Sequence, residues 1–149
     1  MNLSYATQDV VTIVGTKSGT TRTSWNLTSA YQTEGLTKPT KIFAVGGFTK
    51  MNLDVLYTMG AGESTNSIEL RVSGSPDGTN FYRIPNESVS AGTSTLAARE
   101  FTFVGTNEAA ATISIGLDVF YKYVEVAFKE TGVSTTVGTV YCEATLSGF

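Results

Sequence analysis

The sequence predicts an all-β protein, a β-sandwich or jelly roll of about eight mainly antiparallel strands. Apolar and polar residues alternate with a period of two in several segments, which is the pattern of strands with one buried face. Clusters of Gly, Ser, Thr and Asn separate these segments at the spacing typical of a sandwich. Only residues 96–100 and 107–111 have a helix-forming composition, and both stretches are too short to form a stable helix alone.

The clearest strand covers residues 67–73, where apolar and polar side chains alternate strictly. A Ser-Pro-Asp-Gly turn and the apolar residues 81–84 follow it, so we predict a β-hairpin. Pro85 has no backbone donor, and we expect it to end the second strand or to place that strand at a sheet edge. Further strands are predicted at residues 9–14, 41–50, 52–58, 99–104, 118–128 and 137–146.

The apolar side of these strands predicts the core. The residues expected to face inward are Ile68, Leu70, Val72, Phe101, Phe103, Val124, Val126, Val140 and Cys142. Phe81 and Phe120 are also more typical of core than of surface positions. Lys122 interrupts the face that contains Phe120, so we expect a bulge there or a lysine that reaches out to solvent.

The composition argues against catalysis, cofactors and metal binding. The chain has no histidine, which removes catalytic triads, cysteine-histidine pairs and most zinc sites. Cys142 is the single cysteine, so an internal disulfide cannot form, and we expect it to be a buried small side chain. The 13 acidic residues are scattered without a suggestive pair. We therefore expect no enzyme activity, no cofactor and no metal site.

Charge and hydropathy restrict the partners. The net charge is −3 and the ten Lys and Arg residues form no basic stripe, so nucleic-acid binding is not expected. No run approaches the roughly 20 apolar residues that a membrane-spanning helix needs, so no membrane partner is expected. The first residues have neither the basic start nor the apolar stretch of a secretory signal. A binding or structural role is left as the expected function.

The chain length of 149 residues favours a single domain. We expect residues 1–40 to be an N-terminal arm or loop-rich segment with a possible first strand, and residues 41–149 to be the β-sandwich body. Within the first segment, residues 16–40 are polar and weakly patterned. They fit either an arm that lies over neighbouring subunits or an ordinary surface loop.

Four apolar side chains of this segment have no periodicity that would bury them in their own sheet. They are Trp25, Leu27, Tyr31 and Leu36. Such residues gain most by filling pockets of a partner, so we predict that they bind one. Deletion of residues 1–36 is accordingly expected to leave a folded domain with weakened assembly.

A resemblance adds to this interpretation. Residues 70–82, with the Ser-Pro-Asp-Gly hairpin, and the later aromatic strand at residues 120–126 resemble small β-sandwich virion proteins of tailed bacteriophages. The resemblance implies a capsid decoration (cement) protein that binds the major capsid protein, or other virion proteins, on the outer head surface. It also implies a homo-oligomer, with a trimer favoured, made in the host cytoplasm and located on the virion.

Two alternatives remain open. A tail or head-tail structural subunit fits the same composition almost equally well. Similar hairpin and aromatic strands also occur in discoidin-like and carbohydrate-binding sandwiches, and a carbohydrate-binding module would need coplanar exposed aromatic rings. The candidates for such a platform are Trp25, Phe81, Tyr82, Tyr121, Tyr123 and Tyr141.

Overall fold

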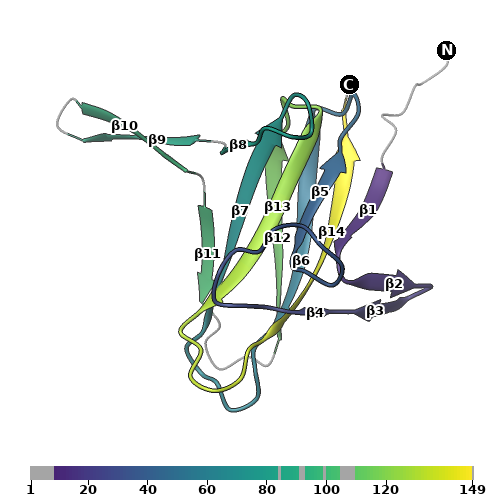
Figure 1. The fold of residues 1–149 in the computed structure, drawn as a ribbon, viewed down its shortest axis with the longest axis vertical. Helices are drawn as coiled ribbons and strands as arrows, with labels where there is room; N and C mark the ends of the chain where they lie inside the picture. Colours follow the sequence, from purple (N-terminus) through teal and green to yellow (C-terminus); the bar gives the residue numbers. More distant parts are fainter. Residues whose placement is uncertain (1–8, 84, 91–92, 99, 105–109, 149) are drawn as a thin grey trace.

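The computed structural model describes residues 9–83, 85–90, 93–98, 100–104 and 110–148, with the side chains of 83–109 left out of the description. Every regular element in this part is a β-strand, which confirms the all-β prediction. All strand pairs in it are antiparallel. Two main sheets pack face to face as a β-sandwich (Figure 1).

The first sheet has the order β1-β14-β6-β12, and β4 also pairs with β14. The bounds are β1 Asp9–Val14, β4 Trp25–Asn26, β6 Lys50–Thr58, β12 Ala110–Asp118 and β14 Thr139–Ser147. The second sheet has the order β11-β7-β13-β5, and β8 also pairs with β7. The bounds are β5 Thr40–Ala44, β7 Ser67–Ser75, β8 Tyr82–Arg83, β11 Glu100–Val104 and β13 Tyr123–Thr131.

Two hairpins form separate two-stranded sheets and extend away from the sandwich in Figure 1. One joins β2 (Thr16–Ser18) to β3 (Thr21–Thr23). The other joins β9 (Pro85–Ser90) to β10 (Thr93–Ala98). Pro85 therefore begins a hairpin strand outside the two main sheets, so its missing N–H does not interrupt the hydrogen bonds of either main sheet.

The pairing of the eight strands that form the main paths of the two sheets is nested. Strand β1 pairs with β14, β5 with β13, β6 with β12 and β7 with β11. Among these eight strands the first thus pairs with the last, the second with the seventh, the third with the sixth and the fourth with the fifth. This nesting is the topology of a jelly roll, an arrangement that leaves few edges exposed to solvent.

The core is built by alternation, as predicted. Among the residues expected to face inward, those with described side chains are at most 1% exposed: Ile68, Leu70, Val72, Val124, Val126, Val140 and Cys142. The side chains of Phe101 and Phe103 lie outside the described residues, although their backbones pair with those of Leu70 and Ile68. Each fully buried Val, Leu or Ile stabilises the fold by about 1.5–3 kcal/mol relative to an exposed one.

Two predicted strands are corrected. The strand expected at residues 41–50 is divided, because Gly46 adopts a positive φ of 57° and the chain turns between β5 and β6. The strand expected at residues 118–128 begins only at Tyr123. Phe120 lies in the connection before it and is 86% exposed, so the core assignment of Phe120 is wrong.

Strand β12 was not predicted. Its inward residues Ile113, Ile115 and Leu117 alternate with polar or small residues, but Gly116 and the Ala-rich start weaken the strand signal. The helix-forming stretches at 96–100 and 107–111 overlap strands where they are described. Pairing with neighbouring strands overrides local helix propensity there.

The N-terminal segment belongs in part to the sandwich. The strand predicted at residues 9–14 is confirmed as β1, and its Ile13 and Val14 are at most 1% exposed. Leu27 donates its N–H to the O of Gly138 (2.9 Å), which directly precedes β14 of the first sheet, and Glu130 of the second sheet donates its N–H to Thr28 O (2.9 Å). Residues 27 and 28 therefore cross from one sheet to the other. Deletion of residues 1–36 would remove the edge strand β1 and core side chains such as Leu27, so the structure favours loss of folding over the intact body expected from the sequence.

Candidate interaction surface

Trp25 lies between two surface hollows. Its side chain is partly buried and packs against the core from β4. One hollow of about 340 Å³ is lined by Trp25, Glu34, Gly35, Leu36, Thr40 and Lys41. The other, of about 300 Å³, is lined by Ser24, Trp25, Asn26, Thr28, Thr37, Lys38 and Pro39. We call these residues together the Trp25 surface.

A tight turn presents Leu36 on this surface. Lys38 donates its N–H to Gly35 O (3.2 Å) and closes the turn. Thr37 adopts a φ of 59°, the one non-glycine residue with positive φ among the described residues. A β-branched residue there costs on the order of 1–3 kcal/mol, and such strain gathers at functional sites. The result is a leucine side chain that is 90% exposed.

The turn is anchored to the edge of the second sheet. Glu34 Oε1 accepts the N–H of Ile42 on β5 (3.1 Å) and lies 3.6 Å from the ammonium of Lys41. Thr40 Oγ1 donates to Gln32 O (2.8 Å). These contacts fix both ends of the loop, so Leu36 stands on a supported turn.

The other two predicted binding residues lie elsewhere. Leu27 is 1% exposed and packs in the core, so the prediction that this segment could not bury it is wrong. Tyr31 lies beside the outer face of the second sheet, where the guanidinium of Arg71 is 4.2 Å and the ammonium of Lys129 is 4.8 Å from its ring centroid. The structure therefore brings Trp25 and Leu36 together and separates Leu27 and Tyr31 from them.

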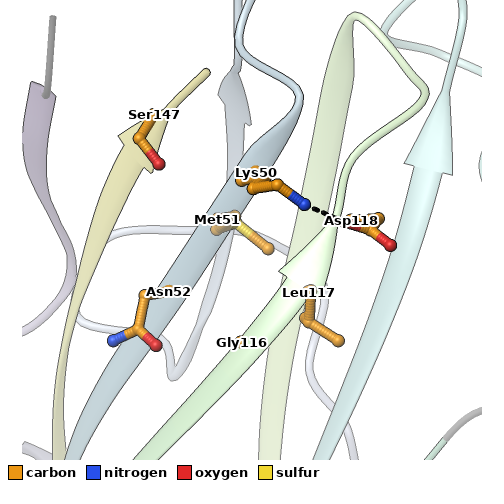
Figure 2. Close-up of a pocket in the computed structure, with 7 residues that line it drawn as sticks. All are labelled: Lys50, Met51, Asn52, Gly116, Leu117, Asp118 and Ser147. Atoms are coloured by element: carbon orange, nitrogen blue, oxygen red, sulfur yellow. Dashed lines mark hydrogen bonds and ion pairs between the residues drawn. The ribbon is translucent and has the colours of Figure 1, made fainter. Parts of the chain in front are cut away.

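Another hollow, of about 360 Å³, lies on the first sheet (Figure 2). An ion pair of 3.0 Å between Lys50 Nζ and Asp118 Oδ1 spans its side. Asn52 and Ser147 also line it, and Gly116 leaves space because it has no side chain. The hollow is open and polar, so it is a shallow depression of the sheet.

The β2–β3 hairpin is attached to the first sheet through Glu143. This carboxylate lies 3.0 Å from Lys17 Nζ and 3.6 Å from Arg22 Nη2, and it accepts the Tyr141 hydroxyl at 2.6 Å. The Tyr141 bond, with Lys17, lowers the pKa of Glu143, while burial raises the pKa of Tyr141. Asp54 is paired directly opposite Glu143 in the sheet, and the two cations offset the repulsion between these two carboxylates.

A buried carboxylate joins the two sheets at one end of the sandwich. Glu130 is 0% exposed and has no cationic partner among the described residues. Its carboxylate accepts hydrogen bonds from Tyr57 Oη (2.5 Å), Asn66 Nδ2 (3.1 Å) and Gly138 N (2.6 Å). Sequence reasoning missed this group, although Glu130 continues the inward alternation of Val126 and Phe128.

The aromatic residues do not share one environment. Tyr82 is 58% and Phe120 is 86% exposed, whereas Tyr141 is 2% exposed. The ring of Tyr121 lies directly over Gly74, where any larger residue would collide with it. Within the described residues, three or more acids or cysteines nowhere gather in a geometry that could hold a metal ion. No helix of this part is long and apolar enough to span a membrane.

Comparisons with known proteins show the fold alone. Neither a protein-family model nor a curated protein matches the chain. The SPBc2 prophage-derived protein YomS is similar at 12% identity over 99% of both chains, with a TM-score of 0.53. Tripeptidyl peptidase 2 matches 93% of this chain with 10% of its own length, at 8% identity and a TM-score of 0.50. A carbohydrate-binding module specific for non-crystalline cellulose matches 87% of this chain and 76% of its own, at 12% identity and a TM-score of 0.47.

Proposed function

We propose that this chain is a non-enzymatic virion structural protein of a tailed bacteriophage, a capsid decoration protein that binds the outer head surface. The observation that carries the proposal is the Trp25 surface, on which a strained turn holds Leu36 90% exposed. The jelly-roll fold is common among capsid and lectin domains. Its likeness to a prophage-derived protein over the full length of both chains supports a phage context.

The Trp25 surface has the properties of a protein contact. Burying Leu36 against a partner would contribute about 1.5–3 kcal/mol to the free energy of binding. The turn already holds Leu36 exposed, so binding needs no rearrangement of this segment. Trp25, partly buried beside two hollows, offers the rigid aromatic anchor that protein interfaces favour. Lys38 and Lys41 also line these hollows, and their charges would contribute more to the rate and specificity of association than to affinity.

The proposed partner is the major capsid protein or another virion protein, and the proposed location is the capsid surface. A symmetric homo-oligomer presents several copies of the Trp25 surface together, so weak single contacts add to strong binding. A trimer matches the three-fold positions of a capsid and is the arrangement we propose for decoration.

Head binding by a surface variant tests the proposal. We expect Leu36→Asp to reduce co-sedimentation with capsids that lack the protein, because it places a charge in an apolar contact. Phe120→Asp is the matched control, since Phe120 is 86% exposed and lies outside the Trp25 surface. Equal binding by both variants would show that the Trp25 surface does not contact the capsid.

Location on the particle tests the decoration role itself. Immunogold labelling of virions from the phage that encodes the chain is expected to decorate heads evenly. Labelling confined to the tail or to the head-tail junction would favour a tail or head-tail subunit. Absence from purified particles, together with binding to polysaccharide, would favour the carbohydrate-binding alternative.

A further inference from the structure

The first sheet ends in two edges of different character. Strand β1 is six residues long, and its register with β14 shifts between Thr12 and Val14. Such a bulge twists an edge and discourages pairing with another chain. Strand β12 forms the opposite edge over nine residues, with a continuous register against β6 from Ala110 to Asp118.

Strand β12 lacks the usual protection of an edge. Its sequence, Ala-Ala-Thr-Ile-Ser-Ile-Gly-Leu-Asp, contains no proline and no lysine. Apart from its pairing with β6, the backbone of 110–118 makes no hydrogen bond to any other described backbone group. The outward N–H and C=O groups of this strand therefore have no backbone partner among the described residues, and such a row is the template that another strand needs.

We infer that β12 pairs with β12 of a second copy of this chain, antiparallel and across a two-fold axis at Ser114. This register overlaps all nine residues and forms on the order of eight backbone hydrogen bonds. Any other self-pairing register overlaps fewer residues and leaves more of the edge unpaired.

The side chains of β12 are compatible with themselves in this register. Ile113 lies opposite the partner's Ile115, and both belong to the inward face. Asp118 is the single charged residue of the strand and lies opposite the partner's Ala110, so no like charges meet. Ser114 faces its own copy on the outer, polar face. The first sheet thus continues from one copy into the next, with its buried and solvent faces in register.

The inference goes beyond the proposed function, since it holds wherever on a virion the chain is located. A two-fold contact joins copies in pairs, whereas the trimer expected for decoration requires a different contact. The stoichiometry of the isolated chain therefore tests the inference, and capsid binding tests the proposed function separately.

Sedimentation velocity of the full chain tests the pairing. We expect a dimer for the natural sequence and at least a tenfold weaker dimer for Ser114→Glu, which sets two carboxylates opposite each other beside two copies of Asp54. Ser18→Glu is the control, because Ser18 is an exposed strand residue on the separate β2–β3 hairpin. It should leave the dimer unchanged, and circular dichroism should show that both variants are folded.

A charge-reversal mixture supplies the second measurement. Ser114→Lys mixed with Ser114→Glu should restore dimers at least as stable as those of the natural sequence, since opposite charges then meet across the axis. A natural chain that stays monomeric or forms only trimers would overturn the inference. A dimer that Ser114→Glu and Ser18→Glu affect equally would overturn it as well.

Discussion

The buried carboxylate of Glu130 allows a sharp test of what holds the two sheets together. Tyr57 extends from β6 and donates to Glu130 of β13, so this hydrogen bond crosses the sandwich. Burial and the bond to Glu130 raise the pKa of Tyr57 well above its usual range, so the hydroxyl stays protonated and donates. Tyr57→Phe keeps the ring in the core and removes this one donor.

The expected loss is about 1.5–3 kcal/mol in the free energy of unfolding, because the bond has a charged acceptor. Asn66 and Gly138 still donate to the carboxylate, so the group remains partly satisfied and the variant should fold. For a chain of this length the loss corresponds to a decrease in Tm of roughly 5–10 °C.

Chemical denaturation by urea, followed by tryptophan fluorescence from Trp25, measures this loss. The midpoint should fall while the m-value stays constant. Tyr82→Phe is the matched control, because Tyr82 is 58% exposed and should change stability by less than about 0.5 kcal/mol. In a double-mutant cycle, Tyr57→Phe should cost less in the background of Glu130→Gln. A cost below about 0.5 kcal/mol, or full additivity with Glu130→Gln, would refute the role of this bond.

Three further predictions concern stability. Deletion of residues 1–36 should unfold the chain, seen as loss of a cooperative thermal transition, because β1 and Leu27 contribute core side chains; a cooperative transition at the original Tm would contradict it. Thr37→Gly should raise or preserve the free energy of unfolding, since glycine adopts φ near 59° without strain. A loss of more than about 1 kcal/mol in that free energy would show that Thr37 is unstrained. Backbone N–H groups of Thr136, Ser134 and Thr135 lower the pKa of Glu63 from 4.5 to about 2, so its stabilisation is complete above pH 4.5 and is lost as the pH falls toward 2. Glu63→Gln should reduce the loss of unfolding free energy between pH 4.5 and about pH 2. An unchanged pH dependence would show that other groups cause this loss.

The sequence predicted the fold where alternation was uninterrupted. In β6 the buried residues follow the period of two, and the turn after β7 has its expected Asp-Gly chemistry, with Gly78 at a positive φ of 79°. In β7 and β14 every apolar residue predicted to face inward is buried, although polar neighbours such as Ser73 and Glu143 are buried as well. Prediction failed where the pattern was ambiguous. The apolar run at residues 41–50 conceals a turn, because two adjacent glycines can occur in a strand or in a bend. Phe120 continued an apolar pattern across a connection and was assigned to the wrong environment.

The candidate site was predicted in part for a similar reason. Trp25 and Leu36 lack periodicity because they lie in a two-residue strand and in a turn, and the structure places both on one surface. Leu27 lacks periodicity as well, yet it is buried, because the chain crosses between the sheets at this point. Burial by a crossover depends on tertiary contacts with β13 and β14, which no local pattern contains.

The position of β14 has a consequence for how the chain folds during synthesis. Strand β14 is the last strand to leave the ribosome, yet it lies between β1 and β6 in the first sheet. Strand β1 has no partner in that sheet until residues 139–147 have been translated. The early strand must therefore wait in an unpaired state while more than one hundred residues are added, which takes on the order of ten seconds. Completion of the sandwich therefore depends on the synthesis of β14, and a nascent chain lacking β14 is the species most exposed to chaperones and to aggregation.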